Sequence, residues 1–192
     1  YLYFHLMGEP LCHPNLERYL TLAGEHGFKV ILTTNGTLLR KQQEMLLHSP
    51  ALHKINVSLH AFEANDLSVP FAKYLEDCFD FGKAAEGKKL VVFRLWNQGG
   101  ADEKNAEILK SMETYFPKPW VSESRGTRIG QRVYLDKKDI YNGTRLPVTD
   151  RHIGRLPDHN EINVASLEVE EKKSIKQNIK AMLMHKVGNV VV

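Results

Sequence analysis

Cysteine is scarce in this chain of 192 residues, which contains only Cys12 and Cys78. Two cysteines do not build a disulfide framework, and alone they do not complete a four-ligand zinc site. Charge of one sign is scarce too: 26 basic and 23 acidic residues leave a net charge of +3, which gives no reason to expect binding to nucleic acid or to a membrane surface. No apolar run approaches the roughly 20 residues that cross a bilayer. No signal peptide is recognised, so a reduced, cytoplasmic setting is expected.

What is present is the composition of an ordinary globular domain. Hydrophobic residues make up 42% and charged residues 26% of the chain, close to the average for soluble domains. The length suits one domain of medium size. The sequence starts at Tyr1 rather than at a methionine, and it starts inside an apolar run. We therefore interpret the chain as a fragment of a longer protein.

Short apolar segments alternate with helical patterns along the first part of the chain. β-Branched and aromatic residues between turn residues predict strands at residues 1–7, 28–33, 54–59 and 89–95. Apolar residues at helical spacing predict helices at residues 14–26, 41–48, 71–85 and 101–115. This alternation is typical of βαβ units. Runs that are apolar on both faces favour a parallel sheet covered by helices, so the predicted class is α/β.

The pattern weakens from residue 117 onward. Residues 133–135 predict one more strand, and the rest of 117–158, rich in Gly, Pro, Arg and Asp, is interpreted as loop. A last helix is predicted at 168–186, because its acidic start and basic later part suit the helix dipole. We expect a core at 1–157 and a helical tail at 158–192.

Polar residues follow the predicted strands, at the end where ligands bind in parallel α/β domains. After the first strand, Gly8 lets the backbone bend closely around a ligand, and Glu9 can accept a charge-assisted hydrogen bond from an ammonium group. Asn35 belongs to a turn signal after the second strand. Ser58 and His60 alternate on the third strand, which predicts that they point to the same face. Each feature taken singly also has a plain structural interpretation as a turn or a strand end.

Arg94 is the polar residue inside the fourth apolar run. Arginine is almost never buried without a partner. Two explanations remain open on the sequence alone: Arg94 binds a ligand carboxylate, or it pairs with an internal acid such as Glu9.

Three motifs are more specific together than these residues are alone. The chain reads Tyr-Phe-His-Leu-Met-Gly-Glu-Pro-Leu-Cys-His-Pro at 3–14, Val-Ile-Leu-Thr-Thr-Asn-Gly-Thr-Leu-Leu at 30–39 and Ile-Asn-Val-Ser-Leu-His at 55–60. Their order and spacing resemble the radical S-adenosylmethionine (SAM) enzyme family over residues 1–97. The resemblance implies a partial (β/α)6 TIM-like barrel, truncated before its second strand, with residues 1–7 as that second strand and a C-terminal helix.

The resemblance also implies roles in binding SAM. Gly8 and Glu9 match the end of the family's Gly-Gly-Glu motif, which holds the SAM amino group, although Met7 stands where the family has the first glycine. Ser58 and His60 occupy the position from which the family contacts the ribose or carboxylate of SAM.

Two further positions are carried over from the family. Arg94 lies on the strand from which polar residues reach SAM, and Asn35 is expected at the mouth of the barrel, near SAM or substrate.

The family's cluster motif, Cys-x3-Cys-x2-Cys, is absent from these residues. Iron–sulfur clusters need thiolate ligands, and Cys12 and Cys78 lack the spacing, so we expect the ligands upstream of this fragment. The resemblance implies that a [4Fe-4S] cluster in the intact enzyme reduces SAM to a 5′-deoxyadenosyl radical, which abstracts hydrogen from an unknown small-molecule or peptide substrate. It also implies an electron donor such as a flavodoxin or ferredoxin. The fragment alone is expected to be inactive.

Two other hypotheses remain open. The chain can be a non-catalytic module derived from such a barrel, which binds a ligand or a partner. It can also be a metal-dependent hydrolase that uses His5, His13 and Glu9, although their spacing matches no zinc pattern.

Overall fold

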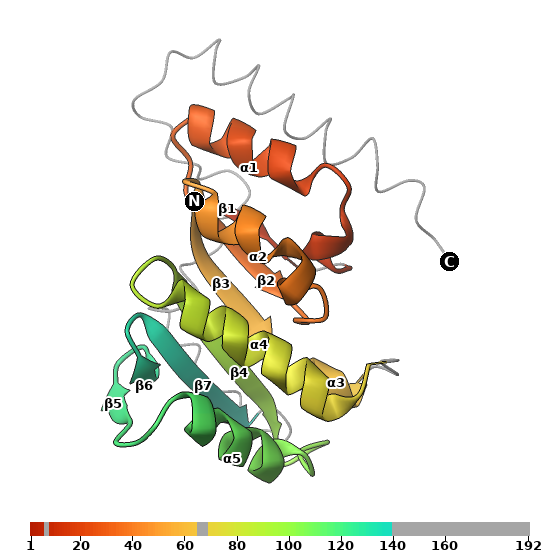
Figure 1. Ribbon diagram of the computed structural model, residues 1–192, viewed down its shortest axis with the longest axis vertical. Coiled ribbons are helices and arrows are strands. Elements are labelled where there is room, and N and C mark those ends of the chain that lie inside the picture. Colours follow the sequence, from red (N-terminus) through yellow and green to blue (C-terminus); the bar gives the residue numbers. More distant parts are fainter. Residues whose placement is uncertain (6–7, 65–68, 140–192) are drawn as a thin grey trace. The chain divides into compact units, whose positions relative to one another are not determined.

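The computed structural model describes residues 1–5, 8–64 and 69–139, which form a seven-stranded sheet with helices between the strands (Figure 1). The strands stand in the order β1-β2-β3-β4-β7-β6-β5. Strands β1 to β4 and β7 pair in parallel, and β5, β6 and β7 pair antiparallel. The bounds are β1 Leu2–Phe4, β2 Val30–Thr34, β3 Leu52–Ser58, β4 Leu90–Gln98, β5 Val121–Glu123, β6 Gly126–Gly130 and β7 Val133–Asp139.

Helices fill the connections between the parallel strands. They are the 3₁₀-helix η1 (Pro10–Cys12) and the α-helices α1 (Leu16–Glu25), α2 (Leu39–His48), α3 (Ala61–Ala64), α4 (Phe71–Ala85) and α5 (Asn105–Tyr115). Successive parallel strands are added in one direction along the sheet, and right-handed crossovers then place every connecting helix on the same face. Figure 1 shows α1, α2, α4 and α5 in front of the sheet. We call this face of the sheet the helix face.

The helix face is apolar and closely packed. Phe93 of β4 is fully buried against α4, where an added Cβ on Gly82 would stand 2.8 Å from the Phe93 ring. Glycine at this position lets helix and strand approach closely. The strand residues buried on this face are Val30, Leu32, Ile55, Val57, Val91, Phe93, Leu95, Val133 and Leu135.

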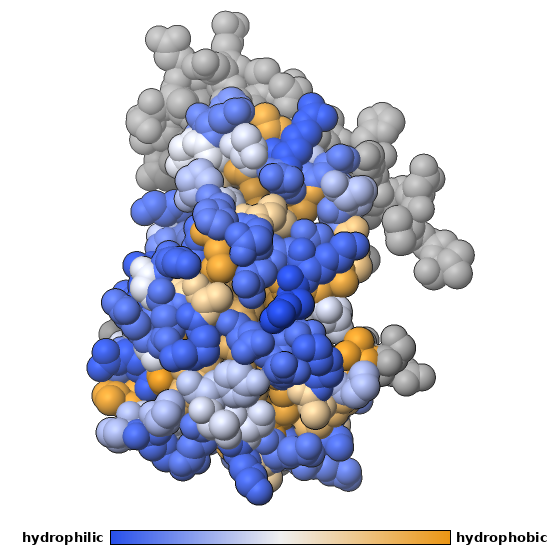
Figure 2. All heavy atoms as spheres, viewed as in Figure 1, coloured by the Kyte–Doolittle hydropathy of each residue, from blue (hydrophilic) through white to orange (hydrophobic). Residues whose placement is uncertain are grey.

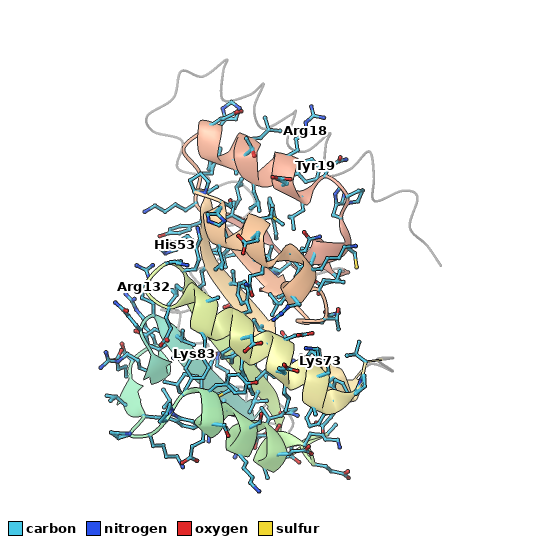
Figure 3. All side chains as sticks on the ribbon, in the orientation of Figure 1. Arg18, Tyr19, His53, Lys73, Lys83 and Arg132 are labelled. Carbon is cyan, nitrogen blue, oxygen red and sulfur yellow. The ribbon has the colours of Figure 1, made fainter. Side chains whose placement is uncertain are left out.

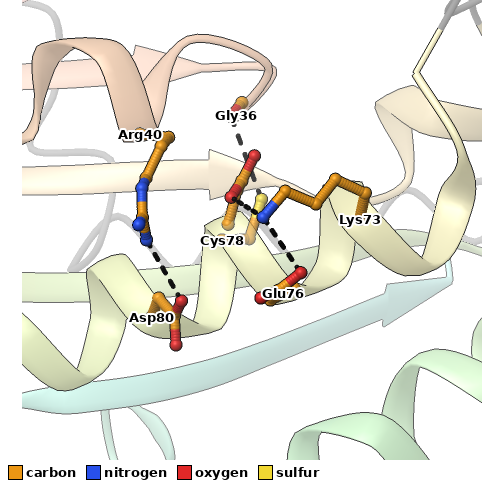
Figure 4. Close-up of polar contacts among 7 residues, drawn as sticks. Gly36, Arg40, Lys73, Glu76, Cys78 and Asp80 are labelled. Carbon is orange, nitrogen blue, oxygen red and sulfur yellow. Dashed lines mark hydrogen bonds and ion pairs between the residues drawn. The ribbon is translucent and has the colours of Figure 1, made fainter.

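The outer surfaces of the helices are hydrophilic, and apolar side chains show in the seams between them (Figure 2). Helices α2 and α4 are also joined by polar contacts (Figure 4). Arg40 pairs with Asp80 at 3.3 Å, and the Cys78 thiol lies 4.0 Å from the Gly36 carbonyl oxygen. Cys78 is buried between these elements, whereas Cys12 is exposed.

The prediction of loop between residue 117 and the strand at 133–135 is wrong for β5 and β6. These strands and β7 form an antiparallel meander with two-residue turns. Gly126 follows the first turn with φ +116°, and an added Cβ would stand 2.8 Å from the Leu135 carbonyl oxygen. The sequence signal is this glycine after a polar dipeptide, flanked by short β-branched runs.

The predicted alternation of strands and helices is confirmed, and β7 extends beyond the predicted 133–135. The result is an α/β fold with a mostly parallel sheet, like part of a TIM-type barrel. The predicted helix at 168–186 and the boundary at 157/158 lie outside the described residues and stay predictions. Within the part of the chain that the structure describes, no helix has the length and apolar character of a membrane span.

Candidate functional site

Glu9 links the end of β1 to the end of β2. Its Oε1 accepts hydrogen bonds from the Leu11 N–H at 3.0 Å and from the Thr34 hydroxyl at 2.7 Å, and its Oε2 accepts one from the Asn35 N–H at 2.7 Å. Glu9 is also the N-cap of η1. A carboxylate offers about four acceptor sites, so Oε2 retains one for a further donor. Glu9 therefore has a structural role and can still bind an ammonium group.

Gly8 places Glu9 at this position. Its φ of +76° is the left-handed conformation, which favours glycine, and an added Cβ would meet no atom within 4 Å. The glycine is thus needed for backbone conformation rather than for space.

Asn35 is held by its own turn. Its Oδ1 accepts hydrogen bonds from the Thr37 N–H at 3.0 Å and the Thr37 hydroxyl at 2.8 Å, which makes an Asx-type turn. The Tyr74 hydroxyl donates to the Asn35 carbonyl oxygen at 2.8 Å. These contacts fix the loop after β2, and the two bonds from Thr37 use the acceptor that the Asn35 side chain would offer a ligand.

Ser58 and His60 do not share a strand, because β3 ends at Ser58 and His60 lies in the following turn. The prediction that they alternate on one strand is therefore wrong. His60 Nδ1 lies 3.2 Å from the Arg94 carbonyl oxygen and 3.4 Å from the Trp96 backbone nitrogen, and burial lowers the pKa of His60. The imidazole thus fastens the turn to β4. No hydrogen bond joins the half-buried Ser58 hydroxyl to another described residue, which leaves it available to a ligand.

The face of the sheet opposite the helices carries polar side chains. We call it the polar face. The register places Ser58, Arg94 and Asp136 in one row across β3, β4 and β7. Because side chains alternate along a strand, neighbouring rows on this face include Thr33 and Asn56, which are joined by a hydrogen bond of 3.1 Å. The polar face is defined by Thr33, Lys54, Asn56, Ser58, Arg94, Trp96, Asp136 and Lys138. The expectation that the strands are apolar on both faces therefore holds only in part, because Val92 is buried on this face among the polar side chains.

Arg94 and Lys138 both lie over the ring of Trp96. The Arg94 guanidinium carbon is 4.2 Å from the ring centroid and Lys138 Nζ is 4.3 Å from it. Trp96 Nε1 donates to Asp136 Oδ2 at 3.1 Å, and Lys138 Nζ is 3.5 Å from the same oxygen. Burial lowers the pKa of Arg94 to about 10, and Asp136 opposes that shift. The acid near Arg94 is therefore Asp136 rather than Glu9, whose hydrogen-bond partners lie in η1 and at the end of β2.

A further cation lies near Arg94, and others lie at the start of the strands. Burial, and next the charge of Arg94, lower the pKa of Lys54 on β3. His53 and Arg132, labelled in Figure 3, lie near the end of the sheet where the parallel strands begin. Burial and then Lys29 and Arg132 lower the pKa of His53. This end of the molecule therefore favours negative charge.

The residues proposed for a metal-dependent hydrolase have other contacts. His13 Nδ1 accepts a hydrogen bond from the Asn15 N–H at 3.1 Å, and the ring of His5 packs edge-on against Tyr3. Across 1–5, 8–64 and 69–139, no group of three His, Cys, Asp or Glu side chains is placed to hold a metal ion.

Sequence reasoning selected Ser58 and Arg94 and missed the six other members of the polar face: Thr33, Lys54, Asn56, Trp96, Asp136 and Lys138. The signal was the period-2 alternation of polar residues along β3, β4 and β7.

No model of a known protein family matches the chain, and no curated protein matches it. Among solved structures it is similar to a crystal structure of archaeal TYW1, with a TM-score of 0.40 and 21% sequence identity. The match covers 58% of this chain and 39% of that one, so the chain spans well under half of that structure's length. What this chain does is therefore inferred from its own residues.

Proposed function

We propose that this chain is the part of a radical SAM enzyme that binds SAM, with Glu9 on the amino group and Ser58 on the ribose or carboxylate. The observation that most supports this proposal is the position of the Glu9 carboxylate. Thr34 and Asn35 hold it at the carboxyl ends of β1 and β2, and its Oε2 can accept one more hydrogen bond. The sequence motifs at 3–14, 30–39 and 55–60 support the same assignment.

The residues present fit SAM. A charge-assisted hydrogen bond between Glu9 and an ammonium group is stronger than a neutral one, and three bonds already hold Glu9 in place, so little side-chain freedom is lost on binding. The Ser58 hydroxyl has no hydrogen bond to another described residue. Gly8 supplies the turn that brings Glu9 to this edge.

The residues present do not fit an iron–sulfur cluster. Burial raises the pKa of the Cys78 thiol, so it resists forming the thiolate that a cluster requires. Cys12 is exposed and stands alone among the described residues. The cluster that provides the reducing electron would need ligands from outside these 192 residues.

If the intact enzyme held such a cluster, bound SAM would supply a carbon radical for hydrogen abstraction. The partners that follow from this proposal are a small-molecule or peptide substrate and an electron donor of the flavodoxin or ferredoxin type. The strands would form part of the wall of a (β/α)6 barrel, in which the polar face lines the interior.

The test is SAM binding by the full 192-residue chain, measured by equilibrium dialysis with radiolabelled SAM. We expect the Glu9→Gln variant to bind at least about tenfold more weakly, because a hydrogen bond to a charged group contributes about 1.5–3 kcal/mol. The matched control is Glu17→Gln, which removes an exposed carboxylate from α1 and should leave SAM affinity unchanged.

Glu9→Gln also weakens the contact with the Asn35 N–H, so a second variant is needed. Ser58→Ala breaks no described hydrogen bond and should bind SAM severalfold more weakly with unchanged thermal stability. If the wild-type chain binds no SAM, or if both variants retain full affinity, the assignment is wrong. The first of these results would favour the non-catalytic barrel-derived module.

A further inference from the structure

Arg94 presents an unmet hydrogen-bonding requirement on the polar face. Its Nε is buried and has no hydrogen-bond partner. The guanidinium contacts the Trp96 ring, and no hydrogen bond connects it to Asp136 in the next strand. Burying a charged donor without a partner is costly, and an anion that met the rest of the guanidinium would offset that cost.

The charges around Arg94 are unbalanced. Lys54 lies close enough for the charge of Arg94 to lower its pKa, and Lys138 shares the Trp96 ring with Arg94. Among the described residues around Arg94, these three cations are accompanied by one carboxylate, that of Asp136. Arg125 also acts on Lys54 with the same sign. An incoming group with about two negative charges would neutralise the excess.

Trp96 and Asp136 keep the cations in position. The indole N–H donates to Asp136, Asp136 contacts Lys138, and the ring supports Arg94 and Lys138 at 4.2 and 4.3 Å. Such cation–π contacts fix a guanidinium without using its N–H donors. The donors are therefore preorganised for a planar or tetrahedral oxyanion, which arginine binds well.

We propose that Arg94, Lys54 and Lys138 form a binding site for a doubly charged oxyanion, a phosphate or a dicarboxylate, carried by a second ligand other than SAM. The site lies on the polar face between β3, β4 and β7, next to Ser58, which the register pairs with Arg94, whereas Glu9 lies at the other side of β2, at the ends of β1 and β2. This inference goes beyond the proposed function and holds whether or not the chain binds SAM.

Calorimetric titration of the full chain with inorganic phosphate and with succinate, at constant ionic strength set with sodium chloride, tests the site. We expect saturable binding of at least one anion. The affinity should fall at least tenfold in Arg94→Gln and severalfold in Lys138→Gln. The matched control is Arg40→Gln, which also removes one positive charge. Arg40 lies on α2 and forms an exposed ion pair with Asp80 of α4 (Figure 4), so this variant should retain the wild-type affinity.

The two anions identify the source of the oxyanion: preferred binding of phosphate indicates a phosphate ester, and preferred binding of succinate indicates a dicarboxylate. Absence of saturable binding to either anion, or equal weakening in Arg94→Gln and Arg40→Gln, would overturn the proposal. Lys138→Gln, at a partly exposed position, keeps the test decisive if Arg94→Gln does not fold.

Competition separates this site from the SAM site. Glu9→Gln should lose SAM and keep the anion, so failure of either proposal is visible without the other. If SAM displaces the anion competitively, the site belongs to the SAM carboxylate and the proposal of a second ligand fails.

Discussion

The two faces of the same strands differ in what their side chains do. On the helix face, Val57, Phe93 and Leu135 are 0%, 0% and 2% exposed and pack under the helices. On the polar face, the neighbours in sequence, Ser58, Arg94 and Asp136, form a row of polar groups. A shift of one residue along a strand thus separates residues that build the fold from residues that can bind a ligand.

The two faces also differ in the kind of contact that their side chains make. The helix face has close van der Waals contacts, as between Gly82 and Phe93. The polar face keeps the Arg94 Nε and Asn56 Oδ1 buried without hydrogen-bond partners, and Asn105 Oδ1 on α5 is unpartnered in the same way. Unmet polar groups reduce the stability of a fold, and functional sites are where such a cost is retained. Three variants can test whether the two faces are really divided in this way.

The largest effect is expected on the helix face. Replacing Phe93 by Ala removes a fully buried ring between β4 and α4 and should lower the free energy of unfolding by about 3–5 kcal/mol. Urea denaturation followed by circular dichroism measures it. Ser58 lies on the neighbouring strand β3 and follows Val57, the register partner of Phe93. Replacing Ser58 by Ala should change the free energy of unfolding by less than about 0.5 kcal/mol. Comparable losses in the two variants would show that both faces support the fold.

A smaller effect of opposite sign is expected on the polar face. Replacing Lys54 by Met keeps a long side chain and removes a charge that burial and Arg94 disfavour, so the unliganded protein should gain about 1 kcal/mol. Because the pKa of Lys54 is lowered in the folded protein, Lys54 loses its proton at a lower pH in the folded protein than in the unfolded chain. The wild type should therefore approach the variant in stability as pH nears 10.5.

The control for this variant is Lys73→Met, because Lys73 on α4 pairs with Glu76 and Asp77 at the surface. It should show no gain. A Lys54→Met protein that is less stable than the wild type at pH 7 would mean that Lys54 supports the fold.

The smallest effect on stability is expected for His60, in the turn after β3. Burial lowers the pKa of His60 in the folded protein. Below about pH 6.5 the unfolded chain therefore binds a proton at His60 more readily than the folded protein does, and the stability of the fold decreases as the pH is lowered. In His60→Asn, an amide oxygen replaces Nδ1 as acceptor for the Trp96 N–H, and this loss should be reduced. Thermal melting at pH 7.5 and 5.5 measures the difference between the two proteins. Parallel pH profiles would show that His60 does not titrate in this range.

The sequence predicted the helix face well and the polar face only in part. Periodic apolar residues such as Leu16, Leu20 and Ala23 are buried along α1 as expected, because burial of an apolar stripe is a local property of the sequence. The meander of β5 and β6 was missed because its strands are short and their side chains are largely exposed.

The candidate site could be assembled only once the pairing register of the strands was known. Glu9, Ser58 and Arg94 were selected from the sequence, yet the anchoring of Glu9 by Thr34 and the row that joins Arg94 to Asp136 depend on which strands are neighbours. The order β4-β7, with α5 and a hairpin between the two strands along the chain, is not a local property. It therefore could not be predicted from motif spacing.

The two tryptophans of the chain stand in different surroundings. Trp96 has two cations over its ring on the polar face, whereas Trp120 has one, Lys118 at 5.4 Å, and its indole N–H donates to the Phe116 carbonyl oxygen at 2.7 Å, beyond the end of α5. Indole fluorescence responds to nearby charge, so each tryptophan reports on its own neighbourhood. With Trp120 replaced by Phe, the emission of Trp96 alone would follow events on the polar face without any attached dye.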